Sequence, residues 1–205
     1  MRNLVLAMSA FGMIASASAA AAQESESTNG TSFRGFRAEA NVGGDRFQSQ
    51  GVNNTKFGYG GTIGFDGQIG KRIVIGPEAS FWRANNWNEN CTPGATGGTI
   101  CHKSFEEFGV GVRAGVLVSP NFLVFGKGGY VVNEQRKRFD APAGQTGFYN
   151  NFNTTGYQLG GGVEYTLSSP EAKVPFYVGA QYVYSQYNDH TSRQRVMGTV
   201  GIRFK

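Results

Sequence analysis

The chain has 205 residues, a formal net charge of +5 and 13% aromatic side chains, which is enough for one sizeable domain and excludes a disordered tail. Its 31 glycines are about 15% of the chain, twice the usual share of about 7%, but with 6 prolines and no three-residue period they exclude collagen. Beyond residue 22 no apolar run approaches the roughly 18 residues of a membrane-spanning helix. A helical membrane protein is therefore excluded, whereas a β-barrel stays open because its strands are apolar only at every second position.

The N-terminus carries the pattern of an export signal. Arg2 gives a basic start, residues 4–14 form an apolar core, and residues 15–22 are small, with several Ala-x-Ala cleavage options. Without Arg2, 18 basic residues face 14 acidic ones, and this net charge of +4 is too small to argue for nucleic acid. The expected organisation is a signal peptide over residues 1–22, a polar leader over 23–32 and one folded domain over 33–205.

Strand periodicity recurs along the mature chain, with apolar residues on one face and glycine or polar residues on the other. Within residues 73–82, Pro77 cannot donate to a ladder and implies a bulge. Within residues 122–132, Phe125 shares a face with Lys127, which leaves the facing of that strand open. In chain order the eight predicted strands lie around residues 36–42, 57–66, 73–82, 109–118, 122–132, 157–165, 178–184 and 195–204.

The connections between these strands alternate in length. Short turns at one end and long loops at the other are typical of an outer-membrane barrel. The short connections are residues 67–72, 119–121 and 168–173, and the longer ones are residues 43–55, 83–104, 133–155 and 185–192.

The strands of a soluble β-sandwich also alternate between apolar and polar residues. The composition of the polar face therefore has to distinguish a soluble sandwich from a membrane barrel. Exposed strand faces usually carry Thr, Lys and Glu, but here the polar face is mostly glycine, which suits a crowded interior. Bilayer hydrocarbon offers no partner to backbone groups, so spanning strands must close into a barrel, and eight strands leave an interior that side chains just fill. We therefore expect an all-β, eight-stranded antiparallel transmembrane barrel.

A few charged residues fall on the inward face at mid-strand. Four carboxylates against five cations are near balance, which a desolvated interior requires because breaking a buried pair costs about 3–5 kcal/mol. The set forms either a plug or a polar path for protons or small ions, and Glu78 and Arg113 are expected to be neighbours on consecutive strands. The predicted interior charges are Arg37, Glu39, Asp66, Glu78, Arg113, Lys127, Glu164, Arg195 and Arg203.

Both cysteines, Cys91 and Cys101, lie in one polar, glycine-rich stretch. Export places them in an oxidising compartment, which favours a local loop disulfide. A metal site needs further Cys or His ligands, and only His102 is close in sequence. We expect no metal and no cofactor.

The chain resembles the eight-stranded outer-membrane β-barrel proteins of the outer membrane protein A-like and opacity-type group of Gram-negative bacteria. This resemblance implies an outer-membrane location, short periplasmic turns, long extracellular loops, and a last strand whose aromatic end, Phe204, is recognised by the barrel assembly machinery. It implies a structural or adhesive role and no catalysis. The segments that carry it are residues 57–66 (FGYGGTIGFD), 75–81 (IGPEASF), 108–115 (FGVGVRAG), 160–165 (GGGVEY) and 200–204 (VGIRF).

Two motifs suggest chemistry but fail on context. The G-x-G-x-x-A match at residues 109–114 needs a strand ending and a helix beginning, yet alternation runs straight through it. His190 and Ser192 invite comparison with outer-membrane lipid A deacylases, but no Asp or Glu follows Asp189 to orient the base. We expect no enzyme, and we keep a narrow channel and a lipid A-modifying enzyme as alternatives.

The basic run Arg136-Lys137-Arg138 follows the fifth predicted strand on its long-loop side. It is either a solvated loop or a set of cations at headgroup level that bind phosphates of lipopolysaccharide, with Phe139 as an interfacial anchor. Outer-membrane lipid is therefore an expected partner, and nucleic acid is not.

Overall fold

The computed structural model describes residues 33–95, 97–168 and 172–204. The expected signal peptide and leader, residues 1–32, lie outside the described residues. The described residues form strands and no helix, and hence contain no helix long and apolar enough to cross a membrane. The strands are β1 (Gly35–Ser49), β2 (Val52–Ile69), β3 (Ile73–Ala84), β4 (Asn88–Pro93), β5 (Thr99–Ser119), β6 (Phe122–Asp140), β7 (Phe148–Thr166), β8 (Phe176–Tyr187) and β9 (Ser192–Phe204).

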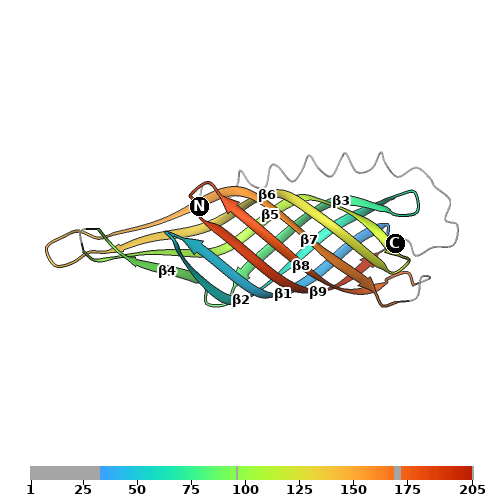
Figure 1. The fold of residues 1–205 in the computed structure, drawn as a ribbon, viewed down its shortest axis with the longest axis horizontal. Coiled ribbons are helices and arrows are strands. Elements are labelled where there is room, and N and C mark those ends of the chain that lie inside the picture. Colours follow the sequence, from blue (N-terminus) through green and yellow to red (C-terminus); the bar gives the residue numbers. More distant parts are fainter. Residues whose placement is uncertain (1–32, 96, 169–171, 205) are drawn as a thin grey trace. The chain divides into compact units, whose positions relative to one another are not determined.

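Eight of these strands hydrogen-bond in a closed ring (Figure 1). Neighbours in the ring are antiparallel, β3 pairs directly with β5, and β1 pairs with β9 to close the ring. A ring within hydrocarbon needs this closure, because lipid cannot satisfy a free strand edge. The predicted eight-stranded antiparallel fold is confirmed. The ninth strand, β4, pairs with β5 alone and lies within residues 83–104, a stretch whose sequence pattern predicts a loop.

The strands continue well beyond the length that crosses a bilayer. β5 has 21 residues and β6 and β7 have 19 each, against roughly 9 to 11 for a tilted spanning strand. The predicted long connections at residues 83–104 and 133–155 are therefore mostly β-structure, and they project at the left of Figure 1. Polar side chains occupy both faces there, so hydrophobic alternation is lost although the backbone stays extended.

The predicted long connection at residues 43–55 is a tight hairpin. β1 and β2 pair as far as Ser49 and Val52, so only Gln50 and Gly51 form the turn, with φ of 52° and 77°. Positive φ at both central residues is the geometry that matches the twist of paired strands. At the opposite end, β2–β3 and β5–β6 are joined by residues 70–72 and 120–121, as expected for the end with short turns.

Pro77 does not cause the predicted bulge. β3 keeps one register with β5 through the pair Pro77–Val112, and its register with β2 is the same on both sides of the proline. Between β2 and β3, pairing is interrupted at Phe65 and Asp66, which lie opposite Pro77 and its neighbour. Pro77 has no backbone N–H to donate towards β2, so ladder hydrogen bonds are lost there while the register of the strand stays the same. The register shifts occur instead on β5, between Ser104 and Glu107 and between Leu117 and Ser119.

The faces of the strands have the polarity of a membrane protein. Ile63, Val118 and Val196 point outward and are 61%, 68% and 66% exposed, whereas most of the buried side chains are polar or charged. On β6, Lys127 is buried and Phe125 packs against buried apolar residues, which settles the open facing of that strand: both point inward. That apolar cluster, near the end with short turns, consists of Phe33, Val74, Leu117 and Leu123.

Candidate functional site in the barrel interior

The lower ionic cluster, defined here as the paired charges towards the end with short turns, is built around Arg113. Its guanidinium binds Asp66 with two hydrogen bonds of 2.8 and 2.5 Å, and its Nη1 lies 3.2 Å from Glu164. Arg203 from β9 reaches the same two carboxylates, at 3.0 and 2.7 Å. Two arginines thus share two carboxylates in a two-by-two arrangement that cross-links β2, β5, β7 and β9.

Arg37 and Lys127 complete this lower cluster. Arg37 lies 2.5 Å from Glu39 and 2.5 Å from Glu78, and the ammonium of Lys127 lies 2.9 Å from the other oxygen of Glu78. These side chains are at most 4% exposed. Because every charged group has an opposite charge within ion-pair distance, the cluster compensates the desolvation that would otherwise disfavour it.

The expected pairing of Glu78 with Arg113 is wrong. In the register of β3 and β5, Arg113 lies opposite Gly76 and Glu78 lies opposite Gly111, so the two charged residues are offset by two positions. The ion pairs among the described residues link Glu78 to Arg37 and Lys127 instead. Neighbouring strands do not determine which interior charges meet, because long side chains reach across the barrel.

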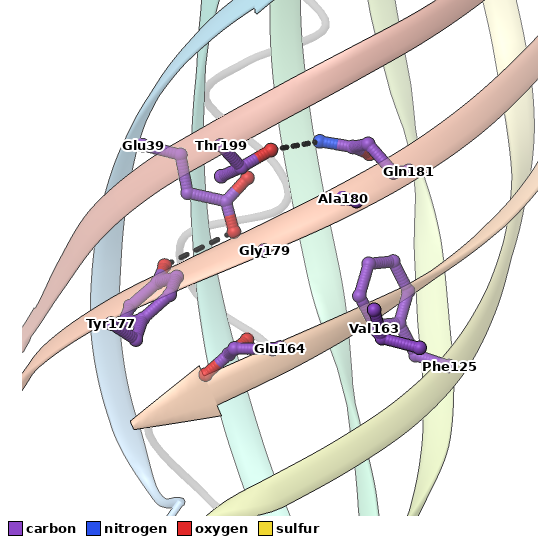
Figure 2. Close-up of a pocket in the computed structure, with 9 residues that line it drawn as sticks. All are labelled: Glu39, Phe125, Val163, Glu164, Tyr177, Gly179, Ala180, Gln181 and Thr199. Atoms are coloured by element: carbon purple, nitrogen blue, oxygen red, sulfur yellow. Dashed lines mark hydrogen bonds between the residues drawn. The ribbon is translucent and has the colours of Figure 1, made fainter. Parts of the chain in front are cut away.

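A layer of uncharged polar groups lies next to the lower cluster. The Thr199 hydroxyl donates to Asn41 at 2.7 Å, and the Gln181 amide donates to Asn41 and to Thr199 at 2.9 Å each. A cavity of about 10 Å³ is lined by Gln181 and Thr199 of this layer and by Glu39 and Tyr177, and the Tyr177 hydroxyl donates a hydrogen bond to Glu39 (Figure 2). That volume is about the size of one water molecule, so it is no passage for a hydrated ion.

A second, upper ionic cluster contains only Arg195 from the set of predicted interior charges. Arg193 pairs with Asp45 at 2.7 Å, and the indole N–H of Trp82 donates to the same carboxylate at 3.1 Å. Arg195 pairs with Glu107 at 2.6 Å. The sequence pattern places Asp45 in a predicted loop and Arg193 and Glu107 next to predicted loops, so it predicts an inward face for none of the three. The two clusters together hold six carboxylates and six cations: Glu39, Asp45, Asp66, Glu78, Glu107 and Glu164 with Arg37, Arg113, Lys127, Arg193, Arg195 and Arg203.

Beyond the barrel, Cys91 and Cys101 form a disulfide between facing residues of β4 and β5. The bridge joins paired strands, not the two ends of an irregular loop. It fixes the only strand in the described part of the chain that lies outside the ring.

The basic run at Arg136–Arg138 is part of strand β6, not a loop, and it does not form one cluster. Lys137 lies opposite the buried His102 and therefore takes the inward face, whereas Arg136 and Arg138 take the outward face. Arg136 pairs with Glu89 at 2.6 Å, and Arg138 pairs with Asp140 at 3.0 Å.

The family follows from the sequence as a whole. A family model described as outer membrane protein beta-barrel domain matches residues 7–204. The chain belongs to this family. Membership places the barrel in the outer membrane, in agreement with the apolar outer face and the closed ring.

Two solved structures of one bacterial protein, Ail, have the same fold as this outer-membrane barrel. Ail, the attachment invasion locus protein of Yersinia pestis, aligns with a TM-score of 0.55 at 16% identity, over 84% of this chain and all of that one. Ail in complex with the heparin analogue sucrose octasulfate aligns with a TM-score of 0.50 at 17% identity, over 83% and 99% of the two chains. Neisserial surface protein A aligns with a TM-score of 0.47 at 14% identity, over 82% and 97%. A search of curated proteins found no match.

In this outer-membrane barrel, the two histidines lie at the mouth. His190 takes a positive φ of 57° in the turn before β9, and Ser192 begins that strand. His102 Nε2 lies 3.4 Å from Asp189, and burial lowers the pKa of His102 although Asp189 acts to raise it. In residues 33–95, 97–168 and 172–204, no group of three or more potential metal ligands comes together.

Proposed function

We propose that the protein is exported by an N-terminal signal peptide to the outer membrane of a Gram-negative cell and has a structural or surface-interaction role there, with a barrel closed to ions. The pairing of interior charges carries this proposal. Every cation of the two clusters lies within 4 Å of a carboxylate, so an ion entering the barrel would have to break pairs whose separation costs about 3–5 kcal/mol.

Conductance in planar lipid bilayers tests the closed interior. The purified protein is expected to show no discrete conductance steps. The matched variant Glu78→Ala, Lys127→Ala removes one acid and one base together, so the net interior charge is unchanged while space opens beside Arg37. This variant is expected to conduct, which would show that the assay detects an opened interior. Steps in the unmodified protein would favour the narrow-channel alternative.

The parts of β4, β5, β6 and β7 that lie within residues 83–104 and 133–155, beyond the barrel, are called the extension, and they support the surface role. The extension carries polar residues on both faces and is fixed by a disulfide, so it offers an ordered platform beyond the apolar band. An epitope inserted in the turn at residues 141–147 should be stained on intact cells, and the same epitope in the turn at residues 70–72 should be stained only after permeabilisation. The reverse result would place the extension in the periplasm.

Lipopolysaccharide is a proposed partner of the outward arginines. Arg136 also lies over the rings of Tyr149 and Phe105, at 5.2 and 5.9 Å, which is an arrangement of cation and aromatic groups suited to the headgroup region. The double variant Arg136→Gln, Arg138→Gln should reduce salt-sensitive co-purification of lipopolysaccharide. Lys137→Gln is the matched control, because Lys137 faces inward and should leave retention unchanged.

The C-terminal strand is the proposed signal for barrel assembly. β9 ends at Phe204, which pairs with Phe36 of β1, and we propose that the assembly machinery recognises this aromatic end.

A lipid A-modifying activity is the weaker alternative. The ion pair that Asp189 forms is with His102 and not with His190, the histidine beside Ser192. Overexpression is expected to leave the mass profile of lipid A unchanged.

A further inference from the structure

The extension beyond the barrel has one strand edge without a partner. On one side, β7 pairs with β6 over nearly its whole length, from Phe148 to Tyr165. On its other side, β7 pairs with β8 only from Gly156 to Thr166. No strand of the described residues covers residues 148–155 on that side, where Asn188 binds Thr155 at the lower end of the stretch. This stretch is called the free edge.

The direction of the backbone groups along the free edge follows from the hydrogen bonds at its two ends. The Thr155 carbonyl accepts from the Asn188 amide at 2.8 Å, and the Leu167 amide donates to the Phe176 carbonyl at 2.9 Å, so odd-numbered residues point towards the β8 side. The Thr166 amide donates to the Asn121 carbonyl at 2.9 Å, so even-numbered residues point towards β6. Tyr149, Asn151 and Asn153 therefore direct their N–H and C=O groups away from the sheet.

This edge lacks the features with which proteins block strand addition. Residues 148–155 (FYNNFNTT) contain no charge, no proline and no glycine. The opposite edge of the same extension, β4, is covered by side-chain bonds to the β1–β2 hairpin: the Asn54 side-chain amide donates to the Glu89 carbonyl at 3.1 Å, and the Asn90 side-chain amide donates to the Phe47 and Val52 carbonyls at 3.2 and 3.3 Å. One edge of the platform is sealed by side chains, and the other presents an open ladder.

We propose that the free edge of β7 is a docking site for an extended polypeptide segment of another protein, which adds as a strand and continues the antiparallel ladder begun by β8. The proposal rests on the proposed surface role only in that the extension faces outside the cell. Backbone donors and acceptors repeated at every second residue fit an extended peptide backbone, and few other ligands carry that spacing. A second copy in the same membrane would present its own β7 in the parallel direction, and its β4 edge is closed.

Peptide binding in detergent micelles tests the site. The probe is a fluorescently labelled seven-residue peptide of alternating Thr and Val, which favours an extended backbone, and binding is followed by fluorescence anisotropy. Asn151→Pro removes one N–H that points away from β6, so the hairpin should keep its fold while binding weakens roughly tenfold. Asn151→Ser is the matched control, because it changes the same side chain, keeps the N–H and should bind as the unmodified protein does.

Three outcomes would overturn the proposal. The first is equal binding of a probe that is N-methylated at every residue, since this control keeps the side chains but removes all donors. The second is equal binding by Asn151→Pro with an unchanged circular dichroism spectrum. The third is a dimer that Asn151→Pro abolishes while the probe fails to bind, which would make a second copy the occupant. The micelle assay does not depend on membrane orientation, so its failure is distinct from a failure of the epitope experiment.

Discussion

Single interior residues hold together strands that are distant in sequence. Asp66 on β2 contacts Arg113 on β5 at 2.5 Å and Arg203 on β9 at 3.0 Å, and it is fully buried. Ion pairs on a protein surface contribute little, but removing one partner of a buried set leaves a desolvated charge without compensation. Asp66 therefore matters for stability because its removal would leave buried arginine charges without full compensation.

Asp66→Asn is expected to destabilise the barrel by about 3–5 kcal/mol, because Arg203 would then share Glu164 with Arg113, whose other carboxylate contact, Glu39, lies 3.6 Å away. Urea unfolding in lipid vesicles measures the change. Asp140→Asn is the control: its ion pair with Arg138 is about half exposed, so a cost below about 1 kcal/mol is expected. Similar costs for the two variants would mean that the interior network does not stabilise the fold.

The elements of the protein differ in how they are held. The eight ring strands have a partner on both sides over most of their length, whereas β4 is held by β5, by asparagine side chains and by the disulfide. Elements with fewer partners open more readily, and this difference should be measurable residue by residue.

Loss of the disulfide should loosen β4 and leave the ring intact. Closing so short a loop contributes roughly 2–3 kcal/mol by a chain-entropy estimate, and here that contribution falls outside the bilayer. A Cys91→Ser, Cys101→Ser double variant should insert, keep its β signal in circular dichroism, and exchange the amide hydrogens of β4 faster. Free thiols in the denatured, oxidised protein would contradict the bridge itself.

Hydrogen exchange along β7 should alternate above the barrel. The amides of Asn150 and Phe152 point to β6 and should be protected, whereas those of Asn151 and Asn153 point to the free edge and should exchange rapidly. Residue-resolved NMR of the protein in micelles gives this pattern directly. Uniform protection from 149 to 154 would mean that the edge is already covered.

At the scale of the whole molecule, the barrel inverts the usual arrangement of a soluble protein. Large apolar side chains surround the outside, and charges and amides fill the inside. Lipid solvates the apolar face, so burial there needs no protein partner, while the interior must satisfy its own polar groups. One face of each spanning strand therefore requires apolar side chains, and the other requires polar side chains with partners inside the barrel.

Val200 on β9 tests which face meets lipid. Val200→Arg should destabilise the protein by about 2–4 kcal/mol if the residue lies near the bilayer midplane, since it is 48% exposed on the apolar face. Val200→Leu keeps the apolar character and should cost little. Urea unfolding in vesicles compares the two, and an equal, small cost for both would show that this face does not contact hydrocarbon.

Local sequence periodicity specifies the fold class and the facing of the spanning strands other than β6. Apolar and small residues alternate at a period of two wherever lipid lies on one side, and this local pattern identified the inward side of Arg37, Asp66 and Glu164 without knowledge of strand pairing. It gave no signal in the extension, because polar side chains occupy both faces of those strands and hydrophobic alternation is lost. β4 is missed for that reason, whereas the buried Asp45 is missed because it lies within residues 43–55, which the sequence predicts as a loop and the structure forms as a hairpin.

Which interior groups meet follows from the tertiary structure alone. The choice of Arg37 and Lys127 as partners of Glu78 depends on side chains that cross the barrel from β1 and β6, and sequence neighbours suggested Arg113 instead. The free edge of β7 likewise exists only because β8 ends at Tyr187 while β7 continues above it, a difference in paired length between two strands. Local periodicity fixes the face of a residue, but contact across a closed ring depends on the register of every strand between the two partners.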